Sequence, residues 1–406
     1  MISLQSAPRW LSIAYSLTAA LFYLPVLMLL YGFKGVGMGD FFLIQGIANL
    51  STFIMEIPTG YIGDLFSRKH TLIIGVLFWI LGYCIWIFGE GFALILTGEL
   101  MFAFAVAFIS GTIEAYLYDL LKKRKKEGIF HKKYAKMKML DNIVLMIATL
   151  TGAFIYQFFG PNAPLYLTIV CLIGAVVILW LLPDVPESKR IVDKDKSKWQ
   201  DIMDISKYAI KHPEIKWLMI SPAIYGTMTL VLMWGLQSVM TFRQIPVFVF
   251  SLVLGTNAFM RTFWSGISGK ILEKIHLSGT IKLQSFIIVI ATIGACLSSY
   301  VPIWAVYGCL FLMIIGSASA VLSNITTSVL VNHRIKSDER ATILSVKSMM
   351  SRAFQGIGLI CLKPLFDSIG VGPTFIATSL LLLPVLVCAW QLYKMNLKTF
   401  EGHQND

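Results

Sequence analysis

The chain has 406 residues, of which 57% are hydrophobic and only 14% are charged, and its mean hydropathy is +0.74. A soluble domain of this length does not need so much apolar surface, so the composition excludes an ordinary soluble protein and favours one embedded in a membrane. The net charge of +12 does not indicate a nucleic-acid partner, because the basic residues lie in short segments between long apolar runs.

Apolar runs of about 20 residues recur along the whole chain, and each is long enough to cross a bilayer as a helix. Alternating ten-residue segments, which a membrane β-barrel would need, are not the pattern here. The sequence therefore predicts an all-α membrane protein with twelve transmembrane helices. In chain order the predicted spans are 11–33, 40–62, 71–89, 91–121, 139–159, 162–182, 217–241, 245–268, 280–299, 301–331, 341–366 and 372–394.

The basic residues are unevenly divided between the two sides of these spans. The largest groups lie at 122–138 and 183–216, whereas the alternate loops hold only Lys34, Arg243 and Lys363. Loops rich in Lys and Arg stay in the cytoplasm. We therefore expect a multi-pass protein of the cytoplasmic (inner) membrane with both termini in the cytoplasm, and we expect the run at 122–126 to touch anionic lipid.

The longest polar stretch divides the chain into two halves of six spans. We expect an N-terminal six-helix bundle at 1–182, a cytoplasmic linker at 183–216 with a short amphipathic helix over 198–211, and a C-terminal bundle at 217–406. The halves echo each other at an offset of 206 residues: Gly60, Gly63 and Gly152 correspond to Gly266, Gly269 and Gly358. An even number of spans in each half predicts a parallel repeat about a pseudo-two-fold axis normal to the membrane.

The segment after the second span carries a family pattern. It reads Gly60-Tyr-Ile-Gly-Asp64-Leu-Phe-Ser-Arg68-Lys69-His-Thr-Leu72. It resembles the loop 2–3 signature of the major facilitator superfamily, Gly-x-Leu-Ala-Asp-Arg-x-Gly-Arg-Lys-x-x-Leu, and five positions match. Leu65 and Ser67 depart from that pattern.

Three further segments are similar to a subset of the superfamily, bacterial drug/metabolite:proton antiporter-type permeases. They are Glu56-Ile-Pro-Thr, Ser110-Gly-Thr-Ile-Glu114-Ala-Tyr-Leu-Tyr-Asp119 and Arg340-Ala-Thr-Ile-Leu-Ser345. The resemblance implies two six-helix bundles and alternating-access transport. It implies a proton-coupled secondary transporter, with sodium still open as the coupling ion, that exports a small organic or amphiphilic compound.

Two other functions remain open. One is proton-coupled import of an anionic or zwitterionic metabolite, such as a metal chelator or an organic acid, and the other is a receptor or scaffold that transports nothing. An enzyme is not expected, because all six histidines lie in or beside polar segments. We expect no cofactor and no metal, and a monomer whose partners are a small-molecule substrate, protons and the lipid bilayer.

Ionisable residues inside a span cost at least ~2.5–3.5 kcal/mol near the bilayer centre, so each is a functional candidate. The candidates for proton coupling are Glu56, Glu99 and Glu114. Glu99 occupies the place, twenty residues before Asp119, where the family often carries an Arg, which argues against the usual Arg-dependent coupling scheme. For Glu56 a structural ion pair, and for Glu114 a structural hydrogen-bond network, remain alternatives.

Polar side chains at helical spacing mark candidate substrate ligands. They are Gln45 and Asn49 in span 2, Asn257 and Arg261 in span 8, and Arg352 and Gln355 in span 11. Arginine can bind a carboxylate or phosphate through two parallel hydrogen bonds, so Arg261 and Arg352 are candidate ligands for an anionic group. An ion pair between Arg352 and Glu56 or Glu99 is the alternative.

A cytoplasmic gate is predicted from the repeat register and the family resemblance. In the register, Asp64 corresponds to Lys270 and Asp141 to Lys347, so the sign of the charge is inverted between the halves. We expect crossed contacts of Asp64 with Lys347 or the nearby Ser345, and of Asp141 with Lys270. The alternative is that these residues only set topology. The remaining gate candidates are Gly60, Arg68 and Asp119.

Overall fold

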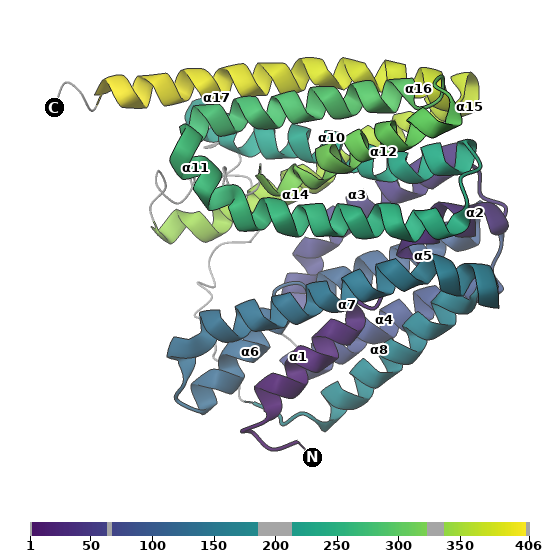
Figure 1. The fold of residues 1–406 in the computed structure, drawn as a ribbon. Coiled ribbons are helices and arrows are strands. Elements are labelled where there is room, and N and C mark those ends of the chain that lie inside the picture. Colours follow the sequence, from purple (N-terminus) through teal and green to yellow (C-terminus); the bar gives the residue numbers. More distant parts are fainter. Residues whose placement is uncertain (1, 63–66, 186–212, 323–336, 403–406) are drawn as a thin grey trace. The chain divides into compact units, whose positions relative to one another are not determined.

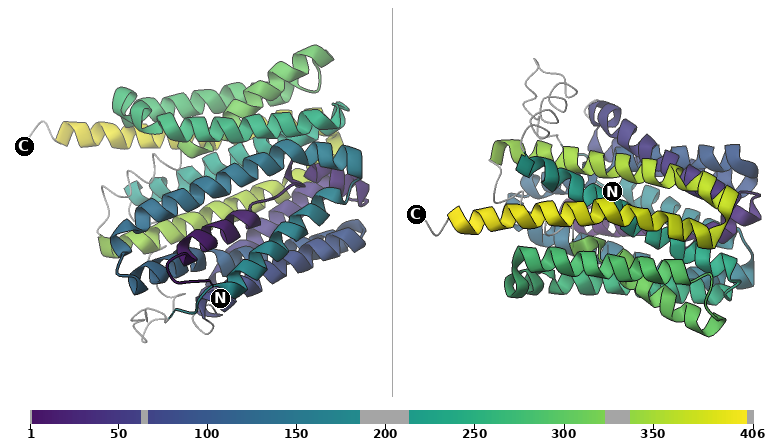
Figure 2. Two further views of the ribbon diagram at one scale, coloured as in Figure 1. Left: turned by 60° about the horizontal axis from the view of Figure 1, so that its bottom comes forward. Right: turned by 90° about the horizontal axis from the view of Figure 1, so that it is seen from above.

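The computed structural model describes residues 2–62, 67–185, 213–322 and 337–402, and every element in them is a helix. The chain divides into two compact units: Met1–Lys194 with Val247–Leu252 (unit 1) and Asp195–Pro246 with Val253–Asp406 (unit 2). Figures 1 and 2 show long helices running side by side in each unit. The predicted amphipathic helix over 198–211 lies outside the described residues, as do most positions of the predicted linker.

Unit 1 is a bundle of helices. In order they are α1 (Ala7–Thr18), η1 (Leu24–Val26), α2 (Leu27–Phe33), α3 (Met38–Ile62), α4 (Arg68–Phe88), α5 (Gly91–Ile109), α6 (Thr112–Lys123), η2 (Glu127–Ile129), α7 (Phe130–Phe159) and α8 (Ala163–Leu181). Helix α5 packs against α3 and α4, and α1 packs against α7 and α8.

Unit 2 follows the same plan. Its helices are α10 (Pro213–Phe242), α11 (Val247–Leu297), α12 (Ile303–Ala318), α14 (Ser337–Ile360), α15 (Leu362–Ile369), α16 (Val371–Thr378), η3 (Ser379–Leu381) and α17 (Leu382–Gly402). Helix α10 packs against α12, α14 and α17. The chain of α11 turns back on itself in Figure 1, and two separate spans lie within it, Val247–Ile275 and Gly279–Leu297.

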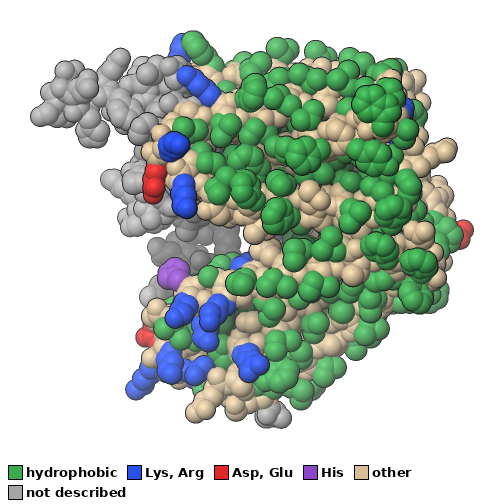
Figure 3. Space-filling view, viewed as in Figure 1, with side chains coloured by type: hydrophobic (Ala, Val, Ile, Leu, Met, Phe, Trp, Pro, Cys, Tyr) green, Lys and Arg blue, Asp and Glu red, His purple; other side chains and the backbone are tan. Residues whose placement is uncertain are grey.

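The prediction of an all-helical membrane fold is confirmed. Ten helices of the described part are long and apolar enough to cross a membrane. The two predicted spans outside this set are 11–33, which is divided among α1, η1 and α2, and 341–366, where α14 carries Lys347 and Arg352. Large apolar side chains such as Trp180, Phe263 and Leu383 are exposed, and Figure 3 shows hydrophobic atoms over much of the surface, as expected for helices facing lipid.

Two predicted spans are interrupted in unit 1. Residues between α1 and η1 form a turn ahead of Pro25, and the span predicted at 91–121 breaks at Ser110 and Gly111. Gly111 has φ +77°, a left-handed conformation that glycine adopts without steric penalty. The break separates α5 from α6, so the predicted span consists of two helical segments rather than one continuous helix.

Candidate functional site

A buried carboxylate lies at the centre of unit 1. Glu99 on α5 is 8% exposed. Its Oε1 accepts hydrogen bonds from the Tyr31 hydroxyl on α2 at 2.5 Å and from Gln45 Nε2 on α3 at 2.6 Å. Gln45 Nε2 also lies 3.3 Å from the Tyr31 hydroxyl. Both donors are neutral, and no described Lys or Arg of unit 1 forms an ion pair with Glu99. We name Glu99, Tyr31 and Gln45 the carboxylate site.

Aromatic side chains cover most of the carboxylate site. Trp86 on α4 is 1% exposed, and its ring centroid lies 5.3 Å from that of Tyr31 and 4.8 Å from that of Phe102. The Tyr83 hydroxyl donates to the Tyr23 hydroxyl at 3.1 Å. Edge-to-face contacts of this kind pack tightly and leave little room for solvent, so Glu99 is held in a low-dielectric environment.

Small residues place Glu99 at this point. A Cβ at Gly98 would lie 2.5 Å from Trp86 Nε1, and a Cβ at Gly82 would lie 2.9 Å from the Gly98 carbonyl oxygen. Helices α4 and α5 can approach so closely only because neither position carries a side chain, as is usual at tight helix crossings in membranes. Glu99 follows Gly98 directly, so this crossing fixes the position of Glu99 within unit 1.

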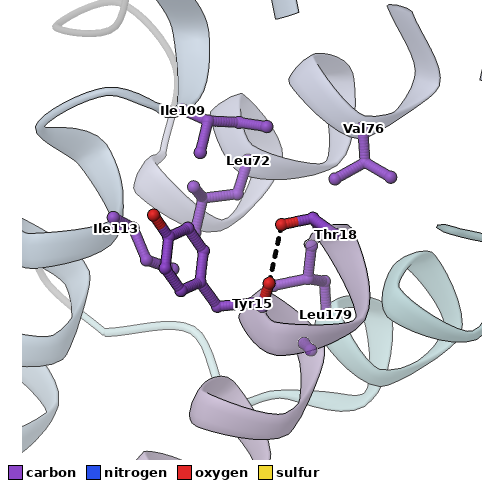
Figure 4. A pocket seen from close by; sticks show the side chains of 8 residues that line it. Tyr15, Thr18, Leu72, Val76, Ile109, Ile113 and Leu179 are labelled. Atoms are coloured by element: carbon purple, nitrogen blue, oxygen red, sulfur yellow. Dashed lines mark hydrogen bonds between the residues drawn. The ribbon is translucent and has the colours of Figure 1, made fainter. Parts of the chain in front are cut away.

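A small pocket of unit 1 lies away from the carboxylate site. It is lined by Ala14, Tyr15, Thr18, Leu72, Val76, Ile109, Ile113 and Leu179, and Figure 4 shows the Thr18 hydroxyl bonded to the Tyr15 carbonyl rather than pointing into it. The pocket is too small for a cargo molecule. It is apolar and contains no carboxylate, so we assign it no substrate.

The N-terminal end of α4 carries a second charged contact. Arg68 lies 2.7 Å from Asp119, whose side chain is 2% exposed. Lys69 donates to the Leu182 carbonyl at 2.8 Å, and the Tyr116 hydroxyl donates to the Pro183 carbonyl at 2.7 Å. These bonds tie α4 and α6 to the end of α8. Of the predicted gate residues, the structure thus brings Arg68 and Asp119 together.

Glu114 lies in the first turn of α6 and is exposed. It accepts a short hydrogen bond from the Tyr134 hydroxyl on α7. Lys138 lies near Tyr134, with its Nζ 5.8 Å from the ring, and donates to the Tyr15 hydroxyl at 2.7 Å. This arrangement is a polar network of the kind that the sequence left open, and proton relay through Glu114 stays a prediction.

The remaining substrate candidates are spread over both units. Asn49 donates to the Gln45 carbonyl at 2.8 Å, and Asn257 donates to the Ser317 hydroxyl at 2.6 Å. Arg261 on α11 is exposed. Arg352 and Gln355 on α14 are half-buried, and a Cβ at Gly226 would lie 2.8 Å from Gln355 Nε2.

The predicted gate pairs stay predictions. Lys347 is buried, Lys270 is exposed and Asp141 is half-buried, but each crossed pair joins residues of different units. Asp64 lies outside the described residues, as does the side chain of Glu56, and Gly60 is described only as part of the α3 backbone.

Sequence reasoning did not single out Tyr31. It lies in an apolar run, where a tyrosine is usually interpreted as a membrane-interface anchor. The only local signal was its hydroxyl within a predicted span, which needs a partner once buried.

Comparison with known proteins identifies the family of the chain. The model of the Major Facilitator Superfamily matches residues 10–359, so the chain belongs to that family. It is 27% identical over 166 residues to the uncharacterized transporter BU466 of Buchnera aphidicola subsp. Acyrthosiphon pisum (strain APS), a match that spans 39% of this chain and 40% of that relative.

Solved structures share the fold. The nucleoside transporter NupG has a TM-score of 0.78 at 16% identity, covering 97% of this chain and 99% of NupG. A bacterial homolog of the lysosomal transporter Spinster gives 0.72 at 14% identity, with 97% and 98% covered. A bacterial homologue of the iron transporter ferroportin gives 0.71 at 15% identity, with 97% and 99% covered. The chain is therefore a multi-pass membrane transporter and not an enzyme.

Proposed function

We propose that the chain is a proton-coupled secondary transporter in which Glu99 takes up and releases the proton. The observation that supports this is the burial of a carboxylate between two neutral donors, Tyr31 and Gln45. An unpaired charge at membrane depth is unfavourable, and protonation of the carboxylate removes it. Coupling follows if the two protonation states favour different conformations of the transporter.

Opposing influences on Glu99 suit it to this role. Burial disfavours the charged form of a carboxyl group, whereas hydrogen bonds donated to the carboxylate favour it. A structural acid is normally held in one state by a cation. The carboxylate site has no such cation among the described residues of unit 1, so its charge can change when its surroundings change.

For the cargo, we propose export of a small organic or amphiphilic compound, in line with the segments that resemble antiporter-type permeases. One observation favours a second candidate, transport of an anionic or zwitterionic metabolite. Arg261 is an exposed cation on a helix of membrane-spanning length, and a charged side chain there must face water or a polar partner. An anionic group on the cargo would satisfy it.

The test uses purified full-length protein in proteoliposomes loaded with a pH-sensitive dye. The added solutes are a nucleoside, a dipeptide, an organic anion and an amphiphilic cation, each with and without an imposed pH gradient. We expect one class to move protons across the membrane as it is transported. Glu99→Gln should abolish the response to the gradient while counterflow of the same solute persists. Transport by Glu99→Gln that still follows the gradient would remove Glu99 from this role.

A matched control is Glu90→Gln. Glu90 precedes α5 by one residue and is exposed at the helix end. Its substitution changes the same charge on the same segment, outside the carboxylate site. We expect its response to the gradient to equal that of the unmodified protein.

A further inference from the structure

The two hydrogen bonds at Glu99 end on the same oxygen. Tyr31 and Gln45 both donate to Oε1. The other oxygen, Oε2, accepts no hydrogen bond from the described part of the chain, and it is not among the fully buried side-chain atoms that lack a partner. Oε2 therefore keeps some accessible surface, while Oε1 is enclosed by its two donors.

This asymmetry assigns different tasks to the two oxygens. An oxygen that already accepts two hydrogen bonds has no lone pair well placed for a proton, because a carboxylate oxygen has about two acceptor sites. Oε2 has its acceptor sites unoccupied by the described residues. A proton arriving at Glu99 thus adds to Oε2, and the group changes from a carboxylate to a carboxylic acid with Oε1 as its carbonyl oxygen.

We propose that Tyr31 and Gln45 are positioning residues that hold Oε1, direct the proton to Oε2 and set the pH at which Glu99 takes it up. This inference rests on the proposed role of Glu99 in coupling. Each donor stabilises the charged form of the carboxylate, so each lowers its affinity for the proton. Without either donor, Glu99 would remain protonated to a higher pH.

The same bonds connect the two interrupted spans. Tyr31 lies on α2, after the turn that divides the first span, and Glu99 lies on α5, before the break at Gly111. Hydrogen bonds to a charged oxygen are roughly twice as strong as those between neutral groups. Protonation at Oε2 removes the charge, so the link between α2 and α5 weakens when the proton binds and strengthens when it leaves.

Other titratable groups near Glu99 are few. The tyrosines Tyr23, Tyr31 and Tyr83 interact electrostatically with it. The charged residues on the packed elements lie toward helix ends: Asp40 opens α3, Glu90 precedes α5, and Lys34 binds the Ile87 carbonyl at the end of α4. Of these six groups only Tyr31 bonds to Glu99, so the shift expected below belongs to the two donors.

The experiment is a pH titration of the protonated carboxyl group by infrared spectroscopy, on the full chain in liposomes and without any substrate. The C=O stretch of the acid should appear as pH falls and should be absent in Glu99→Gln. We expect Tyr31→Phe and Gln45→Leu each to raise the midpoint by about one pH unit, because a hydrogen bond to a charged group contributes ~1.5–3 kcal/mol and one pH unit corresponds to about 1.4 kcal/mol.

The control is Tyr225→Phe in unit 2. Tyr225 is 2% exposed, and its hydroxyl lies 2.7 Å from that of Ser285. The variant therefore removes a buried, bonded hydroxyl of the same kind away from Glu99, and its midpoint should equal that of the unmodified protein.

Each outcome separates the two proposals. If Glu99→Gln leaves the titrating band in place, the proposed coupling role of Glu99 fails. If Glu99→Gln removes the band but Tyr31→Phe and Gln45→Leu leave its midpoint unchanged, only the positioning inference fails. Should Tyr31→Phe not yield folded protein, judged by size-exclusion chromatography, the midpoint of Gln45→Leu decides the matter.

Discussion

The α4–α5 crossing of unit 1 and the α11–α12 crossing of unit 2 both pack a glycine against a backbone carbonyl, but they differ in the side chain that follows that carbonyl. At the first, a Cβ on Gly82 would lie 2.9 Å from the Gly98 carbonyl oxygen, and at the second, a Cβ on Gly294 would lie 3.1 Å from the Cys309 carbonyl oxygen. The residue after each carbonyl is Glu99 in unit 1 and Leu310 in unit 2. The two crossings thus share the close packing of a glycine against a backbone carbonyl, whereas only the α4–α5 crossing has a buried acid at the next position.

Other contacts repeat as well. Gly152 on α7 meets the Phe22 carbonyl of the first span, and a Cβ on Gly358 of α14 would lie 2.5 Å from Thr227 of α10. The sequence pairs these two glycines at an offset of 206 residues. At the α11–α12 crossing the equivalent positions are about 211 residues apart, because the later helices begin further along the chain. An offset of 206 residues, applied to Glu99, would therefore point to the wrong residue of unit 2.

The largest expected effect comes from making the two crossings chemically alike. Leu310 is 1% exposed, and Leu310→Glu would bury an acid without the donors that Glu99 has. We expect it to lower the unfolding free energy by about 3 kcal/mol, measured by thermal unfolding in detergent micelles. The volume-conserving control Leu310→Met should cost about 1 kcal/mol or less. Equal stability of the two variants would mean that unit 2 can hold an acid at this crossing after all.

The paired glycines Gly152 and Gly358 should differ in how much stability is lost when a side chain is added. Gly152→Ala places a methyl group against a backbone carbonyl, which cannot move aside, whereas Gly358→Ala meets the methyl group of a Thr side chain. We expect losses of about 3 and about 1 kcal/mol respectively, since overpacking costs ~1–3 kcal/mol. Gly308→Ala, where nothing lies within 4 Å of the new Cβ, is the control. A larger loss for Gly358→Ala would reverse the order.

A smaller effect concerns the three loop cations that the predicted topology places outside. Arg243 donates to the Ser299 and Val301 carbonyls at 3.0 and 2.8 Å, and Lys34 donates to the Ile87 carbonyl at 2.8 Å. We expect Arg243→Met to lower the unfolding free energy by about 2 kcal/mol and Lys34→Met by about 1 kcal/mol, because the first loses two charged bonds. Lys363→Met, which removes an i,i+4 pair with Asp367, should cost about 0.3–0.5 kcal/mol. Three equal losses would show that these cations are interchangeable.

The smallest effect is a pH dependence of stability to which Lys34 should contribute and Arg243 should not. Burial lowers the pKa of Lys34, and the charge of Glu90 opposes that shift. Between the lowered pKa and the ordinary value of 10.5, the unfolded chain binds more protons than the folded one, so stability rises with pH in that window. Arg243 stays charged throughout. The difference in thermal midpoint between Lys34→Met and the unmodified protein should therefore change across that window, whereas the difference for Arg243→Met should stay constant.

Much of the architecture could be predicted from the sequence. Long apolar runs predict helices because a backbone in lipid must satisfy its own hydrogen bonds, and the Gly60–Leu72 segment indicated the family that the comparison confirms. The interruption at Gly111 could not be predicted in this way. Serine and glycine are tolerated inside membrane helices, so their presence at 110 and 111 does not distinguish a continuous helix from a broken one.

For the candidate site, the sequence determined that Glu99 is an acid in an apolar span and must therefore have a partner or a proton. It also placed Gln45 on the polar face of its helix. Only the tertiary structure decided that Gln45 and Tyr31 converge on one oxygen of Glu99, because residues 31, 45 and 99 meet through the packing of α2, α3 and α5. Periodicity determines which face of a helix is polar, but which helices face each other depends on close contacts between them, such as that of Gly82 on α4 with Gly98 on α5.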